Sequence, residues 1–211
     1  FPFSGNFAGY RGIMSDINDK KQEILPVVKP PRARIAVRLA ECALFVVLMI
    51  VSAFIRIPFP FVPLTFQTVV AILAGLLLGP AWGAASVAVY VFIGLLGLPV
   101  FTSGGGFAYV FQLTFGYIIG FVAAAFAAGL VRGRGRLTLR RAVIAAAVGF
   151  AANYLIGMPY FALIWKYYMQ MNGLGSAMVY YNLIYMPKDL ILSVLAAVLA
   201  ERVCNVLSRR R

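Results

Sequence analysis

The residue types that can do chemistry in this 211-residue chain gather in three polar stretches between long apolar runs. The first is the sequence TSGGG at residues 102–106, whose three glycines let the backbone approach another group closely. The second is a proline-rich segment that leads to Gln67, which carries both a hydrogen-bond donor and an acceptor. The third is the pair Lys188 and Asp189, which follows Pro187. These groups offer hydrogen bonds and one ion pair, which is the chemistry of ligand recognition.

The apolar runs around these stretches indicate the class of protein. Hydrophobic residues make up 63% of the sequence, charged residues only 12%, and the mean hydropathy is +0.91, all outside the range of ordinary soluble domains. A membrane-crossing helix needs about 20 apolar residues. Six apolar runs near that length or somewhat shorter cover residues 35–55, 64–79, 81–97, 109–131, 139–164 and 184–205. The sequence therefore predicts an all-α integral membrane protein with six transmembrane helices.

The chain divides into a polar tail over residues 1–33 and one membrane domain over residues 34–211. Residues 1–13 precede Met14, and we expect them to derive from an expression vector or a trimmed precursor. Sixteen of the 19 Lys and Arg residues fall in the tail and the start of the first helix, in the loop over 132–141, and near the C-terminus. The opposite loops hold only Arg56, Lys166 and Lys188. The positive-inside rule then predicts that both termini are cytoplasmic and that the glycine stretch faces outward.

The basic residues lie at the edges of apolar runs, not on a polar face with exposed aromatic residues, so the charge of +13 does not indicate nucleic-acid binding. Contacts of these arginines with membrane lipids or with a partner fit the same orientation. We expect a multi-pass protein of a bacterial-type cell membrane.

Catalysis and metal binding find little support in the sequence. His is absent, the carboxylates are scattered, and no Cys pair has ligand spacing, so no metal or cofactor is expected. Asp189 and Glu41 fall toward opposite faces of the membrane, which separates the acids that an integral membrane enzyme would need. No residue is therefore assigned a catalytic role.

Polar residues at the outer level of the helices are candidates for ligand binding, since irregular backbone beside lipid needs protein or a water-filled cavity to satisfy it. The candidates are Gln67, Ser103, Gly104, Gly105, Gln112, Thr114, Tyr117, Asn153, Tyr154, Lys188 and Asp189. Each has a structural alternative. The glycines are also consistent with a flexible loop, Gln67 and Asn153 with hydrogen bonds between helices, and Asp189 with the first turn of a helix.

The combination of LTFQT, GLPVF before a glycine run, TFGY and MPKDLILSVLAAVLA resembles the biotin-specific S-component of energy-coupling factor (ECF) vitamin transporters, the BioY family. The resemblance covers about residues 34–206. It implies a six-helix membrane protein that captures biotin from outside and works with a transmembrane T-component and two ATP-hydrolysing subunits. Many members have a proline where Leu113 stands and a lysine where Leu192 stands, three residues after the acid. In this sequence the basic group is Lys188, immediately before the acid.

The chemistry of biotin, taken together with the resemblance, suggests roles for individual residues. Asp189 and Gln67 are expected to pair with the ureido ring of biotin, Tyr117 and the backbone of 104–106 to close over its bicycle, and Lys188 to attract its carboxylate. Ala36 and Ala40 on the first helix are expected to contact the T-component. From their spacing alone, packing inside the bundle is the stronger explanation.

Energy for import must come from the partners, because the chain has no phosphate-binding loop of the form GxxxxGK[ST]. An S-component for another vitamin would share the six helices and the alanine pair, but it should lack LTFQT and TFGY. A membrane enzyme is the second alternative.

Overall fold

The structure is a computed structural model that describes residues 31–57 and 64–209. The predictions that concern the tail up to residue 30, Pro58, Pro60, Pro63, Arg210 and Arg211 lie outside these residues. Contacts divide the chain between Val37 and Arg38, inside the first helix, and the architecture below is that of the residues from Arg38 onward.

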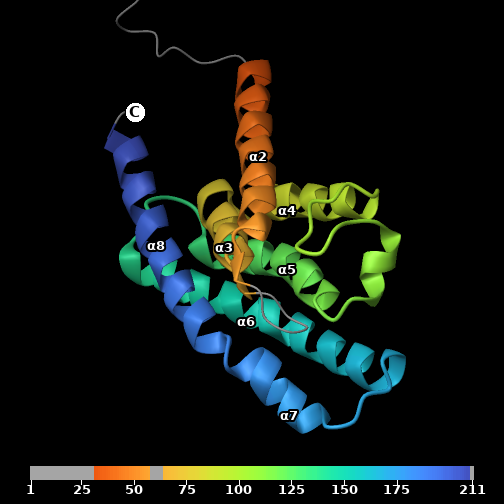
Figure 1. Ribbon diagram of the computed structural model, residues 1–211. Helices are drawn as coiled ribbons and strands as arrows, with labels where there is room; N and C mark the ends of the chain where they lie inside the picture. The colour runs from red at the N-terminus through yellow and green to blue at the C-terminus, as the bar shows by residue number, and fades with distance from the viewer. Residues whose placement is uncertain (1–30, 58–63, 210–211) are drawn as a thin grey trace, which may run out of the picture. The chain divides into compact units, whose positions relative to one another are not determined.

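A helix lies over each of the six predicted runs (Figure 1). The long elements are α2 (Pro31–Phe54), α3 (Gln67–Leu78), α4 (Pro80–Leu95), α5 (Phe115–Arg132), α6 (Leu139–Leu163) and α8 (Met186–Arg209). The short ones are β1 (Arg56–Ile57), β2 (Leu64–Thr65), η1 (Phe107–Phe111), η2 (Ile164–Tyr168), α7 (Leu174–Met178) and η3 (Val179–Leu183). Four segments among the described residues, which contain α2, α5, α6 and α8, are long and apolar enough to cross a membrane, whereas α3 and α4 have 12 and 16 residues.

Helices α3 and α4 follow each other without a loop, as a tight hairpin. Gly79 ends α3 with a φ of 85°, which a side chain would make costly, and Pro80 is the first residue of α4, where its missing N–H costs nothing. Small residues then let α3 pack directly on its neighbours. A Cβ atom on Gly75 would overlap the carbonyl oxygen of Ala125, so α3 meets the backbone of α5 without an intervening side chain.

The start of the fourth long helix differs from the prediction. The apolar run suggested a helix from residue 109, but η1 ends at Phe111, Gln112 is extended, and α5 begins at Phe115. The break has a physical reason in Tyr109, whose hydroxyl hydrogen-bonds Thr102 Oγ1 at 2.9 Å and whose ring is buried. Holding this side chain in the core fixes η1 as a separate turn.

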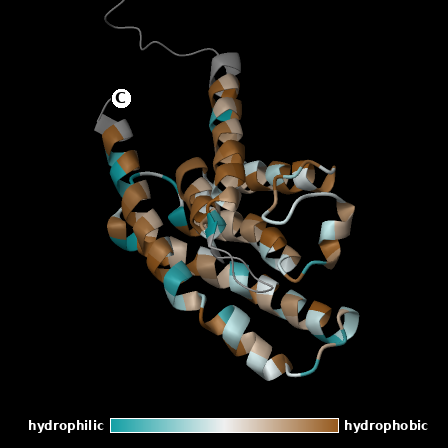
Figure 2. Cartoon of the chain, in the orientation of Figure 1, coloured by the Kyte–Doolittle hydropathy of each residue, from teal (hydrophilic) through white to brown (hydrophobic). Residues whose placement is uncertain are grey.

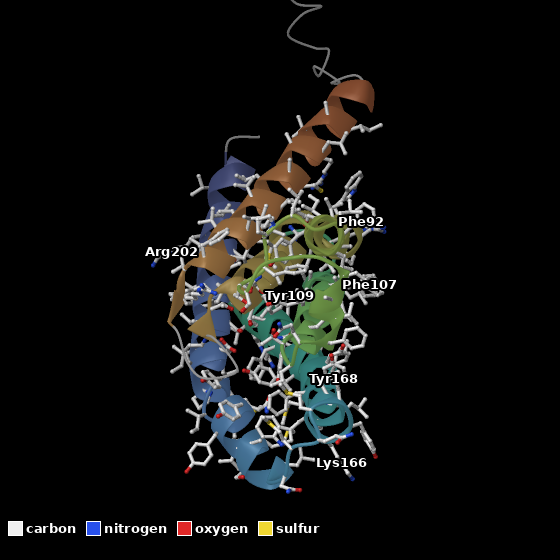
Figure 3. All side chains as sticks on the ribbon, turned by 45° about the vertical axis from the view of Figure 1, so that its right-hand side comes forward. Phe92, Phe107, Tyr109, Lys166, Tyr168 and Arg202 are labelled. Carbon is white, nitrogen blue, oxygen red and sulfur yellow. The ribbon has the colours of Figure 1, made fainter. Side chains whose placement is uncertain are left out.

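Hydrophobic residues make up most of the helices (Figure 2), and many large ones are exposed. Phe92 and Phe107 point outward, whereas Tyr109 lies inside among the helices (Figure 3). Lys166 lies toward one end of the unit and Arg202 toward the other (Figure 3). This distribution of apolar surface and terminal charge is typical of a protein embedded in lipid.

Candidate ligand-binding site

A pocket with an empty volume of about 590 Å³, part of it open to solvent, lies between α3, α5, α6 and α8. The lining residues are Thr65, Gln67, Thr68, Thr102, Thr114, Tyr117, Ile118, Phe121, Asn153, Tyr154, Tyr181, Tyr185, Lys188 and Asp189. Aromatic and aliphatic walls with a few buried polar groups suit a ligand that is mostly apolar.

Seven of the eleven predicted binding residues meet in this pocket: Gln67, Thr114, Tyr117, Asn153, Tyr154, Lys188 and Asp189. Ser103, Gly104, Gly105 and Gln112 do not line it, and the structure leaves Ser103 and Gln112 exposed. Their part in ligand binding stays a prediction.

The wall from α3 is fixed by a chain of hydrogen bonds that begins at Gln67, whose side chain is only 3% exposed. Its Nε2 donates to the Tyr90 hydroxyl at 2.6 Å, and that hydroxyl donates to the carbonyl oxygen of Val100 at 3.2 Å. Gln67 therefore does both things that the sequence suggested, since it bonds to a neighbouring helix and also faces the pocket. These hydrogen bonds connect α3 and α4 to the backbone just before the glycine stretch.

The glycine stretch itself folds as a tight turn. Phe101 and Gly104 exchange two backbone hydrogen bonds, at 2.9 and 3.3 Å, and Gly104 and Gly106 have φ values of 118° and 100°. The Phe101 ring fills the space left by the missing side chain of Gly94. Among residues 102–106, Thr102 alone lines the pocket, so the glycines shape the turn that presents this hydroxyl.

The charged end of the pocket is built at the start of α8. Asp189 is 8% exposed; its Oδ2 accepts a hydrogen bond from the Tyr154 hydroxyl at 2.7 Å, and its Oδ1 lies 2.7 Å from Lys188 Nζ. The Lys188 contact is an ion pair; among the described residues no donor reaches Oδ1 in hydrogen-bonding geometry. Lys188 Nζ also donates to the carbonyl oxygen of Thr65 at 3.0 Å. Although adjacent side chains on a helix diverge by about 100°, the flexible lysine bends back to neutralise its neighbour.

The wall from α5 and α6 depends on two close helix contacts. Tyr117 packs against Gly157, where a Cβ atom would overlap its ring, and meets Tyr154 edge-on with 5.6 Å between ring centroids. Asn153 is 1% exposed and faces Gly120, where a Cβ atom would overlap Asn153 Oδ1. The two glycines make room for the two polar side chains that line the pocket.

The segment between α6 and α8 forms the remaining side of the pocket. Residues 164–183 are largely helical, through η2, α7 and η3, and they bring Tyr181 to the pocket, with Tyr185 one turn further on. The Tyr117 hydroxyl donates to Asn182 Oδ1, and Asn182 is 1% exposed. This hydrogen bond joins α5 to the segment that covers the ligand space.

Seven lining residues were not among the sequence candidates: Thr65, Thr68, Thr102, Ile118, Phe121, Tyr181 and Tyr185. Helical spacing held a usable signal for four of them. Ile118 follows Thr114 by four residues and Phe121 follows Tyr117 by four, while Tyr181, Tyr185 and Asp189 are also spaced by four. A prediction that included every residue on the pocket-facing side of each helix, apolar as well as polar, would have found these four.

The described residues contain no group of three or more His, Cys, Asp or Glu side chains that could hold a metal ion. The site can bind and orient a ligand through Gln67, Asn153, Tyr154, Lys188 and Asp189. Outside the pocket, Ala36 and Ala40 on α2 are both exposed.

Comparisons with known proteins give consistent results. Residues 22–209 match the sequence profile of the BioY family. The probable biotin transporter BioY of Lysinibacillus sphaericus is 39% identical over 175 residues, which cover 82% of this chain and 89% of that protein. The protein with the same description from Pyrococcus horikoshii is 38% identical over 161 residues, covering 76% and 91%.

The fold also has a solved counterpart. The crystal structure of the S-component for biotin from an ECF-type ABC transporter superposes with a TM-score of 0.68 at 24% identity, covering 83% of this chain and 94% of that one. The resemblance read from LTFQT, TFGY and MPKDLILS is thereby confirmed, and the chain belongs to the BioY family.

Proposed function

We propose that this protein is the membrane-embedded biotin-binding subunit, or S-component, of an ECF-type vitamin uptake transporter. It captures biotin at the outer face for import driven by partner ATPases. The observation that carries the proposal is the pocket in which Gln67, Asn153, Tyr154 and Asp189 converge between apolar walls, in a chain whose relatives are named biotin transporters. The relatives are transporters and not enzymes, and biotin is the transported ligand.

The chemistry of biotin suits these walls. Its ureido ring has two N–H donors and a carbonyl, which can pair with the carboxylate of Asp189 and the amide of Gln67. Its apolar bicycle can lie against Tyr117 and Phe121. Its carboxylate is attracted by Lys188 and by the positive end of α8. Asn153 and Tyr154 complete the polar contacts.

The direct test is mass spectrometry of protein purified in detergent without added ligand, followed by calorimetric titration with biotin, thiamine and riboflavin. Co-purified biotin and a preference for biotin of at least about a thousandfold are expected, because a buried polar site rejects ligands that leave its groups unpaired. Tighter binding of another vitamin would make the protein an S-component of different specificity and would contradict the proposal.

The proposed topology has six crossings with both termini in the cytoplasm, and residues 34–211 form the membrane domain. Support comes from the six helices and from the excess of basic residues in the tail, in the loop over 132–141 and near the C-terminus. The short helices α3 and α4 cross as a hairpin within the bundle. Cysteine labelling from outside at positions 104 and 134 tests this topology, since only position 104 should react.

The partners proposed are a T-component and two ATP-hydrolysing subunits. Ala36 and Ala40 form an exposed small-residue pair to which another helix can pack closely. Replacing Ala40 with Trp is expected to reduce co-purification with the T-component roughly tenfold or more, because a large side chain prevents close helix approach. Biotin binding should stay within about twofold of the parent.

The matched control for that experiment is Ala147→Trp, at an exposed alanine on α6. It should leave assembly unchanged. Loss of biotin binding in Ala40→Trp would show instead that this face packs inside the bundle.

The hydrogen bond between Tyr117 and Asn182 is expected to hold the covering segment over bound biotin. Replacing Asn182 with Leu should raise the dissociation rate of biotin roughly tenfold, since it leaves the partly buried hydroxyl of Tyr117 unpaired at a cost of about 1–3 kcal/mol. Stopped-flow displacement of a fluorescent biotin analogue measures this rate. Tyr180→Leu, at an exposed tyrosine of the same segment, is the control and should dissociate at the parental rate.

A further inference from the structure

The loop between α5 and α6 carries a concentration of positive charge that ligand binding does not use. Across residues 132–141, which run from the last residue of α5 into the first turn of α6, arginine occupies five of the ten positions, at Arg132, Arg134, Arg136, Arg140 and Arg141. Among the side chains that the structure describes, ion pairs form only between Arg38 and Glu41 and between Lys188 and Asp189. Glu201, on α8, accepts a hydrogen bond from Asn205 and makes no such pair with the loop. No acidic side chain in the described part of the chain therefore forms an ion pair with these arginines.

Two of the guanidinium groups, those of Arg132 and Arg141, are placed by specific contacts. Arg132 Nε is buried without a hydrogen-bond partner, and its Nη2 has only Cys204 Sγ, a weak acceptor, at 3.9 Å. Arg141 Nη1 lies 3.7 Å from the position that a Cβ atom on Gly133 would occupy. A buried N–H donor without a partner is costly, and an anion that accepts from the Arg132 guanidinium would remove this cost.

The loop is a fixed turn and not a mobile arm. Leu137 is 3% exposed and packs into the core beside Ala142. Thr138 caps α6, with Oγ1 accepting from the Arg141 backbone N–H at 3.4 Å. The N-terminus of this 25-residue helix thus lies at the same place as the arginines, and its dipole adds to the attraction for an anion.

The surroundings indicate which anion fits. Both α5 and α6 are long and apolar enough to cross a membrane, so the loop lies where phospholipid headgroups lie. Leu130 and Leu139, just before and after the arginine-rich turn, are 56% and 47% exposed. A free phosphate would leave these apolar side chains in water, whereas a phospholipid covers them with its acyl chains.

We propose that Arg132 and Arg141, with the N-terminus of α6, form a binding site for the phosphate of an anionic phospholipid. Arg134, Arg136 and Arg140 strengthen the attraction from the exposed side of the turn. The lipid fixes the depth of the α5–α6 connection in its leaflet. This site is separate from the biotin pocket, so its test and the test of biotin binding fail independently.

Native mass spectrometry of the detergent-purified full chain, titrated with phosphatidylglycerol, tests the proposal. The parent should retain bound phosphatidylglycerol, and Arg132→Gln/Arg141→Gln should bind it roughly tenfold or more weakly, because each basic residue near a membrane surface adds to the attraction for anionic lipid. Arg56→Gln/Lys166→Gln, which removes two charges at other loops, is the matched control and should bind as the parent does. Biotin affinity, measured in parallel, should be equal in all three proteins and shows that each is folded.

Two further arms identify the ligand. Phosphatidylcholine should bind no better to the parent than to the double variant, and inorganic phosphate at millimolar concentration should not displace phosphatidylglycerol. Equal binding of phosphatidylglycerol to the parent and the double variant would overturn the proposal. Displacement of phosphatidylglycerol by inorganic phosphate would also overturn it and would indicate a simple anion site. A double variant that binds phosphatidylglycerol normally but no longer assembles with the ATPases would indicate a protein partner instead.

Discussion

Replacing Asp189 with Asn should weaken biotin binding about a hundredfold, because a hydrogen bond to a charged group contributes about 1.5–3 kcal/mol and the proposed contacts with the ureido N–H groups lose the charged acceptor. The carboxylate accepts from Tyr154 and neutralises Lys188 in a site where it is 8% exposed. An asparagine can still accept one hydrogen bond, but it leaves the lysine charge uncompensated and removes the acceptor proposed for the ureido N–H groups. Isothermal titration calorimetry with biotin measures the loss.

A second variant keeps this prediction testable if Asp189→Asn folds poorly. Lys188→Met/Asp189→Asn removes both charges, so no uncompensated charge remains, and it should fold as the parent does while still binding biotin at least about a hundredfold more weakly. Glu41→Gln is the control. Glu41 pairs with Arg38 on the exposed surface, where an ion pair contributes about 0–1 kcal/mol, so its removal should leave biotin affinity unchanged. Parental affinity in the double variant would disprove the role of Asp189.

Replacing Gly75 with Leu should abolish the folded protein or lower its free energy of unfolding by roughly 3 kcal/mol or more, since overpacking against backbone cannot be relieved by a rotamer change. Even a Cβ atom at this position would overlap the carbonyl oxygen of Ala125, and α3 would have to move away from α5. Because Gln67 and Thr68 begin α3, the same movement would open the pocket. Thermal unfolding in detergent, followed by the amount of monomer on size exclusion, measures the effect.

The matched control is Gly175→Leu. Gly175 lies in α7, and a Cβ atom there meets nothing within 4 Å. This change should leave the midpoint of unfolding within a few degrees or raise it slightly, because leucine favours a helix by about 1 kcal/mol over glycine. Equal stability of Gly75→Leu and Gly175→Leu would show that α3 and α5 do not rely on direct backbone contact.

The sequence predicted the helices well because apolar length and glycine–proline punctuation are local properties. Gly79 and Pro80 marked the hairpin, and the start of α6 at Leu139 agreed with the apolar run. The start of α5 could not be found in this way, because it depends on Tyr109 being held by Thr102 in the core. The helical structure of residues 164–183 could not be predicted from the sequence either, since it depends on contacts with α5 such as that of Asn182 with Tyr117.

The candidate site was partly predictable for a similar reason. Asp189, Gln67 and Asn153 stand out as polar residues in apolar helices, and the structure places all three in the pocket. Gly104 and Gly105 also stand out, but their freedom of conformation serves a turn: a Cβ atom on Gly105 would overlap the carbonyl oxygen of Leu98. Residue type alone did not separate a glycine that approaches a ligand from one that approaches its own chain.

The two π-helical turns η2 and η3 bear on how relatives of this chain should be aligned. In η3 the backbone N–H of Ile184 bonds to the carbonyl oxygen of Val179, five residues earlier, so the turn holds one residue more than an α-helical turn. A relative that lacks this extra residue would carry every upstream side chain rotated by about 100° relative to α8. Gap placement at 179–184 therefore decides which homologous residue is compared with Asn182, and a substitution inferred there from an ungapped alignment can be an artefact of register.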